Sequence, residues 1–144
     1  MIITFIGHSQ LTDSVNLKVK IKHAICENAK VAEKIFFYCG GYGAFDSLCA
    51  SACNELKSVF QNSEIILITP YINSISHTDD IYDSIIYPPL ESVPLRLAIL
   101  RRNEWMINES DLIIAFVKNT FGGAYKSLCY AKRKRRKIIN LAEL

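Results

Sequence analysis

Short runs of apolar residues alternate along the chain with longer segments whose apolar residues recur at helical spacing. The runs are continuous and rich in Ile and Phe, which predicts strands covered on both faces. They lie at 2–6, 34–38, 65–68, 112–117 and 137–141. The helical spacing lies at about 13–31, 44–60, 95–109 and 124–135. This alternation predicts a doubly wound, mostly parallel α/β sheet of about five strands, with helices on both faces.

The first predicted helix carries one apolar stripe, and lysines occupy the rest of its surface. The residues expected to be buried are Val15, Leu17, Ile21, Ala24, Ile25 and Ala32. The five cysteines, Cys26, Cys39, Cys49, Cys53 and Cys129, are expected to be small buried hydrophobic residues. Cys49 and Cys53 would share one helix face. No metal site is predicted, because the cysteines and histidines offer no second ligand pair.

The segment 71–94 interrupts the alternation. It is long, partly polar and contains Pro88, Pro89 and Pro94. Loops of this length in a compact domain are usually lids or binding loops. His77, Asp79 and Asp80 fit a segment that closes over a ligand, and a polar surface loop explains them equally well.

The length of 144 residues and the 50% hydrophobic content predict one folded domain over 1–144, which excludes a disordered tail or a peptide hormone. The sequence has no apolar run long enough to cross a bilayer and no signal-peptide pattern at its start, so we expect a cytoplasmic protein without a membrane partner. The net charge of +3 is local: the basic run 132–137 holds six cations, and the remaining residues sum to 11 − 14 = −3. A solvated helix end explains this run, and a contact with nucleic acid or an acidic partner is the less favoured alternative.

Three glycine turns follow predicted strands. They are Gly7-His8-Ser9, Gly40-Gly41-Tyr42-Gly43 and Gly122-Gly123. Ligands of parallel α/β sheets bind outside the carboxyl ends of the strands, and helix N-termini attract anions there, so the three turns together predict a phosphate or other anion site. Any one of them alone is also explained by reversal of the chain. Neither the dinucleotide fingerprint nor a P-loop is present, and no cofactor is expected.

The glycine turns and the stretch from Arg102 to Leu141 resemble the SLOG superfamily, most closely its YpsA-like branch. This superfamily groups the Smf/DprA proteins with the Lonely Guy (LOG) proteins. The resemblance rests on 39–57 and on Arg102-Asn103-x-x-Met106, followed by Ser110-Asp111, a strand and Gly122-Gly123. It implies a Rossmann-like sheet whose glycine turns bind a nucleotide or a nucleotide-derived phosphorylated small molecule, as a sensor or regulatory module.

The resemblance also implies which residues bind the ligand. They are Gly40, Gly41, Gly43, Asp46, Arg102, Asn103, Met106, Gly122 and Gly123, beside Gly7, His8 and Ser9 of the first turn. Arg102 offers a planar fork for phosphate, Asn103 can bond a sugar or base, and Met106 can pack on a flat ring. A surface ion pair is the alternative for Arg102, and a core position is the alternative for Met106. Trp105 fits stacking on a base or a subunit contact.

LOG enzymes resemble this chain at the arginine helix, but the third glycine and the glutamate of their second glycine motif are absent here. The alternative function is that of an N-glycosidase acting on a nucleoside 5′-monophosphate. Because the glutamate is absent, the carboxylate would come from another residue: Asp46 is a weak catalytic candidate, and Glu104 is a weaker one. Asp46 also fits a helix cap. The LOG relatives imply a homodimer.

Overall fold

A computed structural model describes residues 1–72 and 80–143. These residues form a parallel six-stranded sheet of order β4-β3-β2-β1-β5-β6. The strands are β1 (Ile2–Gly7), β2 (Ile35–Cys39), β3 (Ser63–Ile68), β4 (Ser84–Ile86), β5 (Leu112–Phe116) and β6 (Ile138–Asn140). The doubly wound α/β fold is confirmed, with one strand more than predicted.

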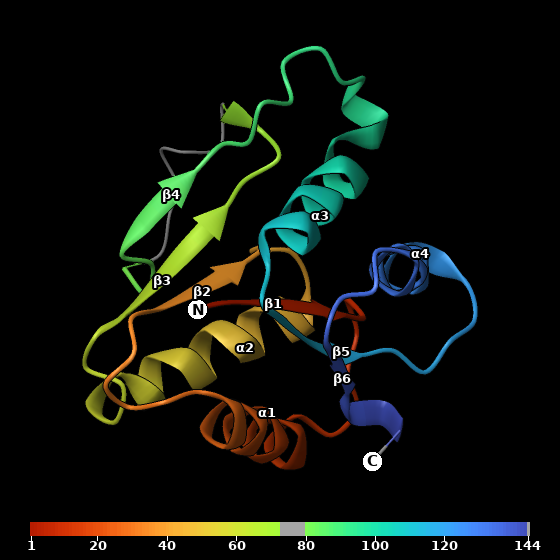
Figure 1. Ribbon diagram of the computed structural model, residues 1–144. Helices are drawn as coiled ribbons and strands as arrows, with labels where there is room; N and C mark the ends of the chain where they lie inside the picture. The colour runs from red at the N-terminus through yellow and green to blue at the C-terminus, as the bar shows by residue number, and fades with distance from the viewer. Residues whose placement is uncertain (73–79, 144) are drawn as a thin grey trace.

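Four α-helices connect and cover these strands: α1 (Ser14–Asn28), α2 (Ala44–Glu55), α3 (Ala98–Glu109) and α4 (Gly122–Arg133). Short 3₁₀ turns occupy Leu56–Ser58, Leu95–Leu97 and Leu141–Glu143. α1 and α2 lie on one face of the sheet, and α3 and α4 lie on the other (Figure 1). Helices therefore cover both faces, as the continuous apolar strands predicted.

The additional strand, β4, lies inside the segment that the sequence predicted to be a loop. It pairs in parallel with β3, with Leu67 opposite Ile85. The Asp83 carboxylate fixes its start, because Oδ2 accepts from the Ile65 N–H at 2.7 Å while Lys57 Nζ bonds the same carboxylate at 2.6 Å. Three residues between polar and proline-rich stretches are too few to show a strand period, so no sequence pattern indicates this strand.

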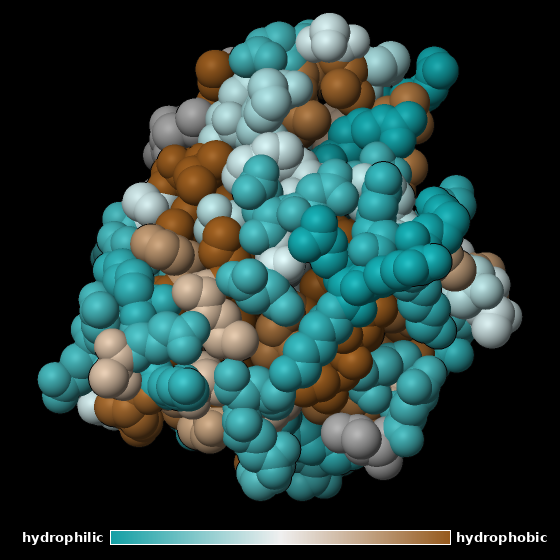
Figure 2. Space-filling view, in the orientation of Figure 1, coloured by the Kyte–Doolittle hydropathy of each residue, from teal (hydrophilic) through white to brown (hydrophobic). Residues whose placement is uncertain are grey.

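The basic run spans the end of α4 and the turn into β6. Lys132 and Arg133 form the last turn of the helix, and Arg135 takes a left-handed conformation with φ of 56°. Every residue of the run except Arg136 is exposed. Hydrophilic side chains cover α4 in the view of Figure 2. The predicted solvated helix end is therefore present, with four of the six residues of the run beyond the helix itself.

In α1 the predicted stripe is only partly buried. Asp13 caps the helix through Oδ1, which accepts from the Asn16 N–H at 3.4 Å. Leu17, Ile21, Ala24 and Ile25 are buried as predicted. The prediction is wrong for Val15, which is 75% exposed on the first turn, and for Ala32, which is exposed because the helix ends at Asn28.

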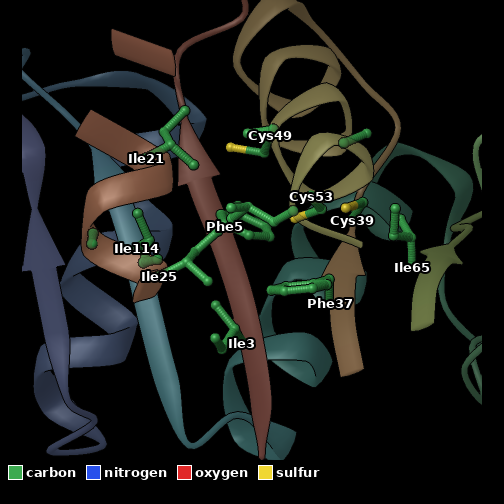
Figure 3. Packing of buried hydrophobic residues seen from close by; sticks show 14 of the residues in the cluster. Ile3, Phe5, Ile21, Ile25, Phe37, Cys39, Cys49, Cys53, Ile65 and Ile114 are labelled. Atoms are coloured by element: carbon green, nitrogen blue, oxygen red, sulfur yellow. The ribbon is translucent and has the colours of Figure 1, made fainter. Parts of the chain in front are cut away.

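The largest part of the core lies between the sheet and the helices α1 and α2. Cys39, Cys49 and Cys53 are fully buried there, beside Phe5 and Phe37 (Figure 3). Burial raises the pKa of the Cys49 thiol well above its usual value, so this group stays neutral at neutral pH. The prediction of buried cysteines is confirmed for these three and wrong for Cys26, which is exposed, and for Cys129, which is partly exposed.

No helix among the described residues is long and apolar enough to span a bilayer.

Candidate functional site

The order of the strands reverses between β1 and β5, and a cavity of about 550 Å³ opens at their carboxyl ends. Its wall comes from four segments: the turn after β1, the start of α2, the inner side of α3, and the turn from β5 into α4. Of the residues predicted from the sequence, the wall contains Gly7, His8, Ser9, Asp46, Arg102, Asn103, Met106, Gly122 and Gly123. Such a switch point is where parallel α/β sheets bind ligands.

His8 joins the two turns that flank the switch point. Its Nε2 accepts from the Lys118 N–H at 2.9 Å, so the ring proton lies on Nδ1. Burial, and then the charge of Lys118, lower the pKa of His8, which keeps the ring neutral at neutral pH. The imidazole therefore holds the turn after β5 against the turn after β1 and offers Nδ1–H as a donor.

The glycines of the second turn, Gly40, Gly41 and Gly43, are not part of the cavity wall. A Cβ on Gly43, whose φ is 90°, would lie 2.7 Å from Ser9 Cα, so glycine is needed for the close approach of the two turns. The Ala44 N–H donates to Ser9 O at 2.8 Å, and the Phe45 N–H donates to His8 O at 3.4 Å. The first two amides of α2 are thus already paired with the turn after β1. The three glycines therefore position that turn, which lines the cavity, without lining the cavity themselves.

Arg102 is 1% exposed and ties α3 to the ends of two strands. Its Nη1 donates to Gly40 O at 2.6 Å and to Ile68 O at 2.7 Å. Its Nε donates to Asn103 Oδ1 at 2.8 Å. The alternative of a surface ion pair therefore does not describe this side chain, and only Nη2 takes no part in these bonds.

Asp46 lies in the first turn of α2 and reaches back toward the glycine turn. Its Oδ2 accepts from the Tyr42 N–H at 3.0 Å, as in a helix cap. Burial raises the pKa of Asp46 to about 6, although the Tyr42 bond and the nearby Arg102 charge both lower it. This carboxyl therefore titrates close to neutrality within a ligand-sized cavity.

The N-terminus of α4 is open to the cavity. Gly122 has φ of 90°, and a Cβ on Gly122 or Gly123 would meet no atom of the described chain within 4 Å. The first turn carries no acidic residue, and the preceding Phe121 makes no capping bond. Lys118 is exposed in the same wall. This end of the cavity combines unoccupied helix amides with a cation, which is the chemistry of a phosphate site.

Two further predicted residues hold the helices in place. Asn103 accepts from Arg102 and donates through Nδ2 to Ser127 Oγ at 3.3 Å, so it links α3 to α4. Met106 is 2% exposed and packs in the core, with an edge in the cavity wall. Trp105 is not in that wall and stacks on Tyr38, with ring centroids 5.8 Å apart.

The other candidates lie elsewhere. Glu104 pairs with Arg101 at 2.7 Å and does not line the cavity. Asp80 is exposed, while His77 and Asp79 fall outside the described residues. No group of three His, Cys, Asp or Glu residues in the described part of the chain could hold a metal ion.

The cavity wall also contains Lys118, Asn119 and Phe121, which were not predicted from the sequence. They lie between a predicted strand and a predicted glycine turn, so their place at the carboxyl edge of the sheet was available from the sequence. They were not predicted because they belong to no glycine turn and are not motif residues, so no sequence pattern marks them.

The fold is shared with two solved proteins. TM1055, a structural genomics target, aligns over 95% of this chain and 71% of its own, with a TM-score of 0.62 at 10% identity. DNA processing protein A from Helicobacter pylori, whose structure concerns single-stranded DNA binding, aligns over 96% of this chain with a TM-score of 0.61 at 15% identity. This chain spans 63% of that protein's length. No family model and no curated protein sequence matches the chain. The chain therefore shares its fold with DNA processing protein A, and the predicted resemblance to the Smf/DprA group is confirmed at the level of the fold.

Proposed function

We propose that residues 1–144 act as one SLOG-type domain that binds a nucleotide or a nucleotide-derived phosphorylated small molecule. The open N-terminus of α4 at the mouth of the switch-point cavity carries this proposal. A ligand phosphate accepts from the first amides of α4, and the Lys118 ammonium adds attraction. A cavity of about 550 Å³ suits a ligand of nucleotide size.

Thermal shift and calorimetry with nucleoside monophosphates, ADP-ribose derivatives and cyclic nucleotides test the proposal. A ligand present at 100 times its Kd stabilises the folded state by about 2.7 kcal/mol, which such measurements detect easily. If no member of this set shifts the unfolding of the folded protein, the proposal fails.

A pair of variants locates the phosphate. Gly123→Asp adds a carboxylate at the helix N-terminus. The helix dipole stabilises this carboxylate, but the carboxylate repels a phosphate. Gly123→Asn is the neutral, nearly isosteric control. Position 123 has room for either side chain, because a Cβ there meets no atom of the described chain within 4 Å. We expect ligand binding to be lost in Gly123→Asp and largely kept in Gly123→Asn. Equal binding by both variants would place the phosphate elsewhere.

A second candidate function is hydrolysis of the N-glycosidic bond of a nucleoside 5′-monophosphate. The observation in its favour is a carboxyl in the cavity, Asp46, with a pKa of about 6. Such a group can stabilise an oxocarbenium-like state or activate water. Chromatography for released base tests it. Release by the wild type that stops in Asp46→Asn while binding persists supports the hydrolase, and release unaffected by that change rules out this role for Asp46.

Single-stranded DNA binding is a third candidate, because the similar DNA processing protein A is described as binding single-stranded DNA. In this chain the basic run 132–137 would provide the contacts. This candidate predicts binding that weakens steeply with salt and disappears when the cations of the run are neutralised. The homodimer implied by the LOG resemblance stays a prediction, which light scattering can test.

A further inference from the structure

The linker 117–121 carries the chain from the end of β5 to the first turn of α4. Its first residue, Val117, is buried, and Asn140 of β6 bonds both of its backbone polar groups. Asn140 Oδ1 accepts from the Val117 N–H at 3.0 Å, and Nδ2 donates to Val117 O at 3.1 Å. Every residue from 118 to 123 is exposed. The position of the N-terminus of α4 therefore depends on few contacts.

His8, in the turn after β1, makes the next contact with this linker. Its Nε2 accepts from the Lys118 N–H at 2.9 Å and lies 3.5 Å from the Asn119 nitrogen. The ring also packs edge-on against Phe116, with centroids 6.4 Å apart. In the described part of the chain, no later side chain bonds to the linker before α4 begins. This is therefore the last hydrogen bond from a side chain before the proposed phosphate site.

Only the neutral ring can make this contact. Protonation places a hydrogen on Nε2, which turns this atom from an acceptor into a donor. It would then face the Lys118 N–H, which is also a donor, so the bond cannot persist. Burial, and then the charge of Lys118, lower the pKa of His8 below its usual value of 6.5. The contact is therefore intact at neutral pH and breaks in a window below pH 6.5.

Two further charged side chains line the cavity with His8 and Lys118: Asp46 from α2 and Arg102 from α3. Arg102 stays charged over this pH range. Asp46 has a pKa of about 6 and titrates in the same range. A test of His8 therefore needs a variant that removes the titration of the imidazole and leaves Asp46 in place.

We propose that His8 is a positioning residue: its neutral ring holds the start of α4 in the ligand-binding arrangement, and its protonation releases a bound phosphate. This inference rests on the proposed function and concerns the regulation of the same site. The amides that would bind the phosphate follow directly on the linker that His8 holds. Once the linker is free, the affinity falls with the fraction of protein in the competent arrangement, by up to about tenfold per pH unit.

Nuclear magnetic resonance of the ligand-free protein tests the first step. The main variant is His8→Gln, because Gln Oε1 can accept from the Lys118 N–H and does not titrate. In the wild type we expect the amide signals of Gly122 and Gly123 to shift with the same midpoint as the His8 ring. In His8→Gln this transition should be absent, while any effect of Asp46 remains. Constant signals of both glycines while His8 titrates would overturn the proposal.

Calorimetry from pH 7.5 down to pH 4.5 tests the second step, with the nucleoside 5′-monophosphate that the wild type binds most tightly. We expect equal affinities of the wild type and His8→Gln at pH 7.5. Below the midpoint of the ring titration, the wild type should lose affinity relative to His8→Gln by about tenfold per pH unit. The control is His23→Gln on α1, where the histidine is 71% exposed and pairs with Glu27. It should follow the wild type at every pH, and protonation of the ligand affects all three proteins alike.

The outcomes separate this inference from the proposed function. If the wild type gains affinity relative to His8→Gln as the pH falls, the imidazolium binds the phosphate directly and the positioning role is overturned, while the phosphate site stands. If no monophosphate binds, the proposed function fails and the regulation of binding fails with it. The amides of Gly122 and Gly123 then still decide whether His8 holds the start of α4. If His8→Gln does not fold, different midpoints for these amides and the ring in the wild type overturn the proposal.

Discussion

At the scale of single residues, Asp46 holds its place in the cavity at a cost in stability. Burial raises the pKa of Asp46 from 3.8 to about 6, so the charged form is less favourable in the folded protein than in the unfolded chain. Between these two pKa values the folded protein binds more protons than the unfolded chain, and stability falls as the pH rises through this window. The charged group facing this carboxyl is Arg102, from α3, and Cys49 below it on α2 is a neutral thiol. A stability cost of this kind is typical of residues kept for function.

The unliganded Asp46→Asn variant should therefore be more stable than the wild type at pH 7.5, by at most roughly 3 kcal/mol, and of equal stability near pH 4. Urea unfolding at both pH values measures the difference. Lower stability of the variant at pH 7.5 would instead show that the capping bond to Tyr42 is the main contribution of this side chain.

Two glycines of the site differ in why they are glycine. A Cβ on Gly7 would lie 2.2 Å from the Phe45 ring, which is fully buried and stacks on Phe116 at 6.3 Å. A Cβ on Gly123 would lie in open space.

We expect Gly7→Ala to destabilise the protein by about 1–3 kcal/mol, because the buried ring must shift. Gly123→Ala should be neutral or stabilise it by up to ~1 kcal/mol, because glycine weakens a helix interior. Thermal unfolding of the two variants decides between them. If both had the same effect, the close approach of Gly7 to Phe45 would not limit the fold.

At the scale of elements, Arg102 connects α3 to the sheet through hydrogen bonds. Two carbonyls at the ends of β2 and β3 depend on its Nη1 for their bonds. Polar groups left unpaired in a buried place are costly, so this arginine stabilises the helix position that forms one wall of the cavity.

Arg102→Met should destabilise the protein by about 2–5 kcal/mol, because it leaves the Gly40 and Ile68 carbonyls without this donor. Arg101→Met is the matched control: the neighbouring arginine is exposed and pairs only at the surface with Glu104, so its loss should cost less than about 1 kcal/mol. Denaturant unfolding gives both values. A cost for Arg102→Met as small as that of the control would show that Arg102 is held for the ligand alone.

At the scale of the whole molecule, the charge of the chain and the proposed site are separate. The cavity opens at the N-terminus of α4, and the basic run begins at the other end of the same 12-residue helix, about 15 Å away. At moderate salt the Debye length of about 8–10 Å is shorter than this separation.

Replacement of Lys132, Arg133, Lys134 and Arg135 by Gln should therefore leave the affinity for a nucleotide within about twofold at 0.15 M salt. The same change should remove any binding of single-stranded DNA. Calorimetry and a salt titration with an oligonucleotide measure the two effects. Loss of nucleotide affinity in this variant would mean that the basic run belongs to the ligand site.

The sequence by itself determined the elements and their order. Continuous apolar runs and helical stripes depend on neighbours within one element, so β1, β2, β3, β5, β6 and the four α-helices were all readable, while β4 was too short to show a period. The motif on α3 also lies on the helix that forms one wall of the cavity. Only the tertiary structure shows the contacts of each motif residue. Arg102 donates to carbonyls at the ends of two strands, and the first two amides of α2 bond to the turn after β1. The space in front of the first residues of α4 is open. These roles depend on distances between segments far apart in the chain, and a sequence pattern carries no such distances.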